Sequence, residues 1–187
     1  MRVISGKFKG TKLKIPHNYD IRPTQDRVKE SIFNVIGDKI IESKVLDLFT
    51  GSGSLGIEAL SRGASLVYFV DRSIKSVRLI QDNLRVVKAK ENSEGSFKII
   101  KNDVLKFLKS AKDIVWDIIF IDPPYKIDKN IMEELFNIFS SGAIINRNSV
   151  LIYEYFFKRD ISSEIKLMKV LKKTHFGDKI VSYISLL

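Results

Sequence analysis

The chain of 187 residues contains no cysteine and only two histidines. Disulfide bonds and thiolate metal sites are therefore excluded. His17 and His175 lie far apart in the sequence, so a histidine-rich metal site is not expected either. No apolar run approaches the ~20 residues that a membrane-spanning helix needs, and the N-terminus has no apolar signal core. These absences predict a cytoplasmic protein with no membrane segment.

Positive charge is in excess, with 32 basic against 22 acidic residues and a net charge of +10. A basic surface attracts nucleic acid by long-range attraction and counterion release. A general drift toward lysine would also raise the charge, so its distribution is more informative than its total. The segment 1–14 carries basic charges only, and two arginines follow it. These basic residues are Arg2, Lys7, Lys9, Lys12, Lys14, Arg22 and Arg27. The clustering favours a docking surface over a merely solvated face.

Short β-rich runs alternate with segments of helical spacing through most of the chain. Strands are expected near 45–49, 66–70, 97–101, 116–121 and 149–155, and helices near 54–62, 73–88, 103–110 and 129–140. This alternation predicts right-handed crossovers and a parallel sheet covered on both faces. A further helix is expected from Thr24, a suitable N-cap, to near Gly37.

The two ends of the chain depart from this alternation. Runs 166–174 and 179–187 are joined by a short glycine turn with no helix between them, which predicts an antiparallel hairpin. Residues 1–15 predict a small β-hairpin, with Gly6 and Gly10 near its bend. The length is that of one domain with a sizeable core.

A glycine loop lies between the strand near 45–49 and the following helix. Glycines let the backbone turn sharply and approach a ligand, and the helix start presents unpaired N–H groups. The next strand ends in Asp71, where a carboxylate can accept hydrogen bonds from both hydroxyls of a ribose. A plain helix N-cap is the alternative role for Asp71.

A second motif, Asp122-Pro123-Pro124-Tyr125, follows the apolar run 116–121. The prolines fix φ and remove backbone donors, so the Pro123 carbonyl can point into a site as an acceptor. Asp122 supplies a second acceptor and Tyr125 a face for stacking. Together they complement a nucleobase that carries an exocyclic amine. The alternative is a strand that ends in a proline turn with a half-buried tyrosine.

Four acidic residues follow four different expected strands. Because ligands bind beyond the carboxyl ends of strands in open α/β sheets, these carboxylates should converge on one edge. They are Asp47, Asp71, Asp103 and Asp122. Such a cluster could bind Mg²⁺, but the glycine loop and the Pro-Pro-Tyr turn would then have no role. We therefore expect no metal.

The ordered motifs resemble those of S-adenosylmethionine-dependent methyltransferases that act on exocyclic amines. The motifs are Asp47-x3-Gly51-x-Gly53, Asp71, Asn102-Asp103 and Asp122-Pro-Pro-Tyr125. The N-terminal pattern, from Arg2 to Gly10 and from Ile21 to Asn34, is similar to that of the bacterial 16S rRNA guanine-N2 methyltransferase family. This resemblance spans residues 1–187.

The resemblance implies a Rossmann-like methyltransferase fold of the α/β class. Its sheet would have seven strands, mostly parallel, with a C-terminal antiparallel hairpin. Residues 1–20 would form a β-hairpin extension that docks RNA, and residues 21–187 the methyltransferase domain, within one compact domain overall.

The resemblance also implies roles for individual residues. The cofactor, S-adenosylmethionine, would be held by the loop 47–56, by a ribose-binding pair and by an adenine-binding pair. These residues are Asp47, Phe49, Thr50, Gly51, Gly53, Gly56, Asp71, Arg72, Asn102 and Asp103. Asp122 and the Pro123 carbonyl would hold the N2 amine of a guanine on which Tyr125 stacks.

The implied partner is 16S rRNA or the assembling small ribosomal subunit, and a monomer is expected. RNA contacts would come from Lys7, Lys9, Lys12, Arg22 and Arg27. Three alternatives remain at this stage. They are an adenine-N6 DNA methyltransferase, a glutamine-directed protein methyltransferase and a non-catalytic RNA-binding module. The sequence does not identify the modified nucleotide, and it does not separate naked RNA from an assembled subunit.

Overall fold

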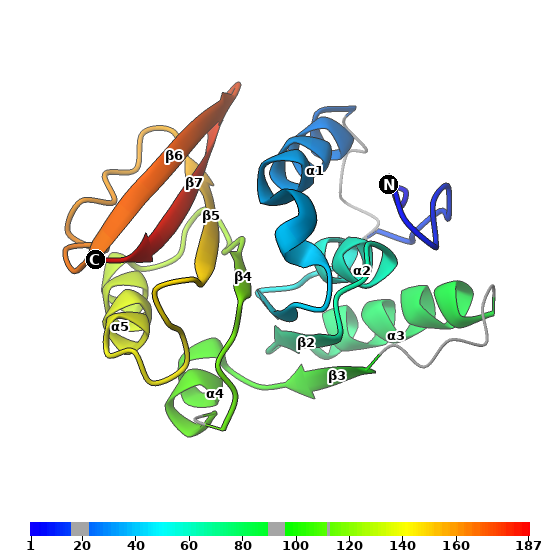
Figure 1. Cartoon of the computed structure of the whole chain (residues 1–187), viewed down its shortest axis with the longest axis horizontal. Helices are drawn as coiled ribbons and strands as arrows, with labels where there is room; N and C mark the ends of the chain where they lie inside the picture. The colour runs from blue at the N-terminus through cyan, green and yellow to red at the C-terminus, as the bar shows by residue number, and fades with distance from the viewer. Residues whose placement is uncertain (16–22, 90–95, 112) are drawn as a thin grey trace.

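The computed structural model describes residues 1–15, 23–89, 96–111 and 113–187, and side chains resume at Asp26 after the first gap. A seven-stranded sheet in the order β3-β2-β1-β4-β5-β7-β6 runs through the molecule (Figure 1). The strands are β1 (Lys44–Leu48), β2 (Leu66–Asp71), β3 (Ser96–Lys101), β4 (Ile118–Ile121), β5 (Val150–Phe156), β6 (Met168–Phe176) and β7 (Lys179–Leu186). The helices are α1 (Pro23–Ile36), the 3₁₀ helix η1 (Gly37–Ile40), α2 (Ser54–Ser61), α3 (Ile74–Lys88), α4 (Val104–Ser110) and α5 (Lys129–Ser140).

The sheet is parallel from β3 to β5 and antiparallel at β7 and β6. β6 and β7 form a hairpin closed by Gly177 and Asp178. This arrangement confirms the expected mostly parallel sheet with a C-terminal antiparallel hairpin. The carboxyl ends of the parallel strands therefore meet at one edge of the sheet, where ligands bind in such folds.

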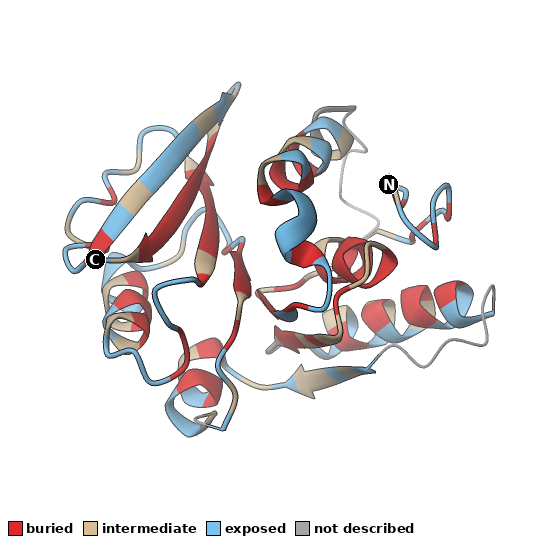
Figure 2. Cartoon of the chain, viewed as in Figure 1, coloured by how far each residue is buried: buried red, intermediate tan, exposed pale blue. Residues whose placement is uncertain are grey.

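Two apolar cores lie on opposite faces of the sheet because successive side chains of a strand point to opposite sides. In β4, Ile118 and Phe120 pack with α1, α2 and α3, whereas Ile119 and Ile121 pack with α4 and α5. Figure 2 shows buried residues along β4, β5 and β7 and on the inward sides of the helices. Burial on both faces explains why these strands read as continuous apolar runs in the sequence.

A few element boundaries differ from the sequence predictions. β4 begins at Ile118 instead of residue 116, because the Trp116 N–H donates to the Ile144 carbonyl in a loop, at 2.9 Å. β6 begins at Met168, since a turn precedes it in which the Met168 N–H donates to the Ile165 carbonyl, at 2.9 Å. Thr24 is the second residue of α1 and not its N-cap, since proline suits the first helical position. The short helix η1 was not expected.

The N-terminal segment, residues 1–15, runs antiparallel to itself but forms only the bridge Arg2–Lys12 as β structure within the described residues. Its two arms are joined by the Val3 N–H, which donates to the Thr11 carbonyl at 2.9 Å, and by the Leu13 N–H, which donates to the Met1 carbonyl at 3.0 Å. Its backbone also bonds to α2, where the Lys7 N–H donates to the Ser61 carbonyl at 2.8 Å. Gly6 allows this approach, since a Cβ there would lie 1.8 Å from that carbonyl oxygen. The predicted hairpin is thus present, with cross-strand backbone hydrogen bonds between its two arms and further contacts with α2.

The N-terminal segment is also held by one buried carboxylate, that of Glu58 in α2. Its two oxygens accept the Ile4 and Ser5 N–H groups at 2.8 and 2.9 Å. Arg62 and Lys29 pair with the same carboxylate at 2.9 and 3.4 Å. Glu58 is fully buried, so its charge depends on these four partners.

We predict that Glu58→Ala lowers the free energy of unfolding by about 3–5 kcal/mol, because it leaves Lys29 buried without its counter-charge and two N–H groups without an acceptor. Urea unfolding followed by circular dichroism measures this change. Glu134→Ala removes an exposed carboxylate that pairs with Lys109 and should cost less than about 1 kcal/mol. Equal losses for the two variants would contradict the role of Glu58.

Candidate active site

The glycine loop connects β1 to α2 at the carboxyl edge of the sheet. Phe49 has a positive φ of 55°, an unusual backbone for a residue with a side chain, and Gly53 is the N-cap of α2. The Gly53 N–H donates to the Thr50 carbonyl at 2.8 Å and closes the turn. Phe49, Thr50 and Gly51 line a large cavity, whereas Gly53 is not among its lining residues.

Asp47, near the end of β1, holds this loop in place. One oxygen of its buried carboxylate accepts both the Gly56 N–H and the Thr50 hydroxyl, each at 2.9 Å. Gly56 is required at its position, because a Cβ there would lie 2.3 Å from the Phe69 ring and 3.0 Å from Asp47. Gly56 therefore serves packing of the loop and does not line the cavity.

Burial raises the pKa of Asp47 to about 7. The hydrogen bonds from Thr50 and Gly56 favour the charged form and oppose this shift, while the negative charge of Asp71 adds to it. Asp47 is thus a weaker acid than an exposed aspartate. A cationic group in the cavity would favour its ionised form.

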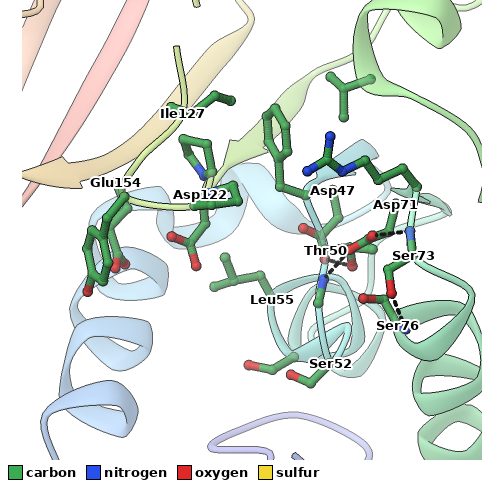
Figure 3. Close-up of a pocket in the computed structure, with 18 of the residues that line it drawn as sticks. Asp47, Thr50, Ser52, Leu55, Asp71, Ser73, Ser76, Asp122, Ile127 and Glu154 are labelled. Atoms are coloured by element: carbon green, nitrogen blue, oxygen red, sulfur yellow. Dashed lines mark hydrogen bonds between the residues drawn. The ribbon is translucent and has the colours of Figure 1, made fainter. Parts of the chain in front are cut away.

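Asp71 ends β2 and faces the same loop. Its two oxygens accept the Gly51 N–H at 3.0 Å and the Ser73 N–H at 2.8 Å, as Figure 3 shows. Arg72, Ser73 and Ser76 also line the cavity. Ser73, and not Asp71, is the N-cap of α3, with its hydroxyl accepting from the Ser76 N–H. The N-cap alternative for Asp71 is therefore wrong.

Asn102 and Asp103 follow β3 but differ in position. Asp103 lines the cavity, and its carboxylate caps α4 by accepting the Lys106 N–H at 3.2 Å. Asn102 is not among the lining residues. Its backbone N–H donates to the Asp71 carbonyl at 3.1 Å and its side chain accepts the Asp103 N–H at 2.9 Å. Asn102 thus joins the ends of β2 and β3 and orients Asp103.

The Asp122–Tyr125 turn follows β4 and forms another part of the cavity wall. All four of its residues are lining residues. The Ile127 N–H donates to the Pro124 carbonyl at 2.9 Å, whereas the Pro123 carbonyl accepts no hydrogen bond from any residue that the structure describes. The Tyr125 ring is 60% exposed and packs edge-on against Phe156. An acceptor and an aromatic face are thus available to a ligand.

Two further charged residues stand beside this turn, and sequence reasoning missed both. Glu154 of β5 and Lys179 of β7 form an ion pair and line the cavity. Glu154 could have been noticed as a lone carboxylate within the apolar strand β5. Lys179 could not, since nothing in the sequence distinguishes it from the many other lysines of this chain.

Asp122 is an exposed residue, yet the cavity walls and nearby charges raise its pKa above its ordinary value. The enclosing walls remove much of the bulk water around it, and the charges of Glu154 and Asp47 disfavour a further negative charge. Lys179 opposes this effect. Lys179 is itself partly desolvated, which lowers its pKa, but its interactions with Glu154, Asp122 and Tyr125 together outweigh burial and raise it.

The cavity has a volume of about 1030 Å³ and gathers most of the residues expected at the cofactor and amine sites. Those that line it are Asp47, Phe49, Thr50, Gly51, Asp71, Arg72, Asp103, Asp122, Pro123 and Tyr125.

The RNA-binding candidates Lys7, Lys9, Lys12 and Arg27 are exposed and lie outside the cavity, while Arg22 falls outside the described residues. In the described part of the chain, no group of three or more side chains is arranged to hold a metal. None of the described helices is long and apolar enough to cross a membrane.

The sheet order, the glycine loop and the acidic strand ends define an S-adenosylmethionine-dependent methyltransferase. The chain belongs to the family described as "Conserved hypothetical protein 95", whose model matches residues 1–185. It is 36% identical over 156 residues to ribosomal RNA small subunit methyltransferase D of Escherichia coli (strain K12), covering 82% of this chain and 73% of that protein. The family resemblance drawn from the motifs is confirmed.

Two solved structures share the fold. One is the Escherichia coli protein yhhF, provisionally named a methyltransferase, with a TM-score of 0.81, 26% identity and coverage of 100% of this chain and 97% of that one. The other, SMU.776, also provisionally named a methyltransferase, is complexed with SAH. Its TM-score is 0.70, its identity 19% and the coverage 89% of this chain and 50% of that chain.

We predict that Asp47 makes the ligand-free protein less stable as the pH rises from about 3.8 to about 7. Over this interval the folded protein keeps a proton that the unfolded chain releases, so stability present below the unfolded pKa is lost as the pH approaches the folded pKa. The slope is at most about 1.4 kcal/mol per pH unit.

Urea unfolding of the wild type and of Asp47→Asn at several pH values measures this effect. Asparagine keeps the size and one acceptor but does not titrate, so the stability of the wild type relative to the variant should fall across the interval. Parallel curves for the two proteins would show that Asp47 has an ordinary pKa.

Proposed function

We propose that the protein transfers a methyl group from S-adenosylmethionine to the exocyclic N2 amine of a guanine in 16S rRNA. One observation carries this proposal, namely that the Asp122–Tyr125 turn and the glycine loop line the same cavity. Its volume of about 1030 Å³ is at the upper end of the roughly 300–1,000 Å³ of small-molecule sites. A cofactor and a base would therefore meet inside it.

The residues at the ends of β1, β2 and β3 suit S-adenosylmethionine. When bound, this cofactor supplies an electrophilic methyl group on a cationic sulfur. Asp71 is placed to accept ribose hydroxyls, and its two present N–H partners hold the carboxylate in position for them. Asp103 has a second oxygen for an adenine amine beside its capping bond, and Asp47 adds negative charge under the loop.

The Asp122–Tyr125 turn suits an amine in the plane of a base. Asp122 and the Pro123 carbonyl would accept its two N–H bonds, and Tyr125 would stack on the ring. Accepting these bonds concentrates electron density on a nitrogen whose lone pair is otherwise delocalised. As the new N–C bond forms, the nitrogen gains positive charge and loses a proton, which Asp122 is placed to take in its ionised form. Positioning and local electrostatics supply most of the acceleration.

RNA docking is assigned to residues 1–20 within a single compact domain whose remainder, residues 21–187, is catalytic. Lys7, Lys9 and Lys12 are exposed, and two other residues of this segment, Met1 and Ile15, line the cavity. RNA held by these lysines would thus lie close to the cavity. A paired base cannot reach it, so the target would be unpaired or flipped out. The substrate would be 16S rRNA, or the assembling small subunit, in the cytoplasm.

The alternatives receive less support. An adenine-N6 DNA methyltransferase would use the same Asp122–Tyr125 turn, but the similar Escherichia coli protein is named for ribosomal RNA. A glutamine-directed protein methyltransferase typically has Asn in place of Asp122. A non-catalytic RNA-binding module would not need the intact loop that Asp47 holds.

We predict that wild-type protein methylates small-subunit rRNA at the N2 amine of one guanine, whereas Asp122→Ala loses at least about a hundredfold in the rate of methyl transfer. Positioning and proton transfer of this kind are each worth roughly that much. Single-turnover transfer to rRNA from a strain lacking the protein, followed by nuclease digestion and mass spectrometry, gives the rate and the modified nucleotide.

Cofactor affinity, measured by calorimetry, is the control, since Asp122 is assigned to the base and not to the cofactor, and its loss should change this affinity little. Methylation at adenine N6, or on protein alone, would refute the proposed function. A variant within a few-fold of the wild-type rate would make the Asp122–Tyr125 turn merely structural.

We predict that changing Lys7, Lys9 and Lys12 together to Gln weakens rRNA binding and flattens its salt dependence. Each lost phosphate contact reduces the slope of log affinity against log salt by about 0.7–0.9, so the triple variant could change it by roughly two. Lys14 is left in place because it pairs with Asp82. Filter binding at several salt concentrations measures the slope.

The matched control changes Lys169, Lys172 and Lys173 of β6 to Gln. These lysines are exposed, so the control removes the same amount of charge from another part of the surface. Losses of equal size in the two triple variants would indicate a diffuse field instead of a docking surface.

A further inference from the structure

Glu154 is placed beside Asp122 by the register of the sheet. Ile121 of β4 pairs with Tyr153 of β5, so the next position along each strand brings Asp122 next to Glu154 on the same face. Both residues line the cavity, and Figure 3 shows their side chains on one side of it, away from Asp71. None of the residues proposed above to hold the cofactor is Glu154.

Lys179 holds Glu154 in this position from the neighbouring strand β7. Its ammonium group pairs with one oxygen of the carboxylate, and the other oxygen has no partner among the described residues. The same ammonium group lies 5.5 Å from the centre of the Tyr125 ring. Glu154 is only 9% exposed, and a buried carboxylate is retained only when it is paired. The pair therefore fixes one free acceptor beside the stacking ring.

A free acceptor at this place distinguishes the two purines that carry an exocyclic amine. Guanine presents its N1–H donor directly beside the N2 amine, so adjacent carboxylates can accept from both. Adenine presents a lone pair at N1 beside its N6 amine, and this lone pair would face a carboxylate. A site built to accept a hydrogen bond rejects an analogue without the donor, because its own polar group then stays unpaired.

We propose that Glu154 reads the N1–H of the guanine whose amine Asp122 holds, and that Lys179 positions Glu154 for this contact. This inference rests on the proposed function and extends it to the residue that selects the base. Glu154 would touch the substrate, whereas Lys179 would act through Glu154 and the Tyr125 ring.

The test uses a short RNA that spans the mapped target, with either guanine or 2-aminopurine at that position. Both bases carry the 2-amino group, but 2-aminopurine has an acceptor at N1. Affinity is measured with S-adenosylhomocysteine present, and methyl transfer with S-adenosylmethionine. We expect the wild type to prefer guanine by about 10–100-fold, the effect of one hydrogen bond to a charged group.

Glu154→Gln offers an amide that can donate to N1 of 2-aminopurine, so the preference should fall at least tenfold in both binding and transfer. Lys179→Met should reduce the preference as well, and Lys179→Arg, which can keep the ion pair, should restore it. Glu134→Gln, in an ion pair outside the cavity, should leave the preference unchanged. Urea unfolding of each variant establishes that it is folded.

A wild type that methylates guanine N2 but shows the same preference after Glu154→Gln would overturn this inference alone. Equal losses on both bases would assign Glu154 a structural role and would also overturn it. A wild type that does not methylate the guanine RNA at all would refute the proposed function instead.

Discussion

The hydrogen bonds that Asp47 accepts from Gly56 and Thr50 are the constraint on which the site depends. They join the end of β1 to the first turn of α2 and so determine the path of the loop between them. The loop then offers its Gly51 N–H to Asp71, which ties β2 to the same structure. Burial makes the ionisation of the Asp47 carboxyl group costly and raises its pKa to about 7.

Most of the fold could be predicted from the sequence, because its strands are short apolar runs separated by segments of helical spacing. The predictions failed where tertiary contacts replace local patterns. Trp116 looks like a strand residue, but its backbone pairs with a loop. The N-terminal segment forms the expected hairpin, yet Gly6 also serves a close approach to Ser61 that was not predicted. Neither partner is visible from the neighbouring sequence.

The site was predictable to the extent that it lies at strand ends. Asp71, Asp103 and Asp122 line the cavity because the carboxyl ends of parallel strands share one edge. Gly56 and Asn102 occupy motif positions but do not line the cavity. Gly56 donates to Asp47, and Asn102 accepts the Asp103 N–H. Glu154 and Lys179 were missed for a different reason. Their place depends on the order of β4, β5 and β7 in the sheet, which spacing along the chain does not reveal.

Because β7 is antiparallel to β5, it places the positive charge of Lys179 at the cavity. β7 runs opposite to β5, so its first residue, Lys179, lies at the carboxyl edge of the sheet, whereas a parallel strand brings its last residues there. A cation at this edge partly offsets the repulsion between Asp122 and Glu154. It allows two carboxylates to stand side by side facing one cavity. The hairpin that separates this fold from a fully parallel sheet is therefore also what makes this acidic wall of the cavity possible.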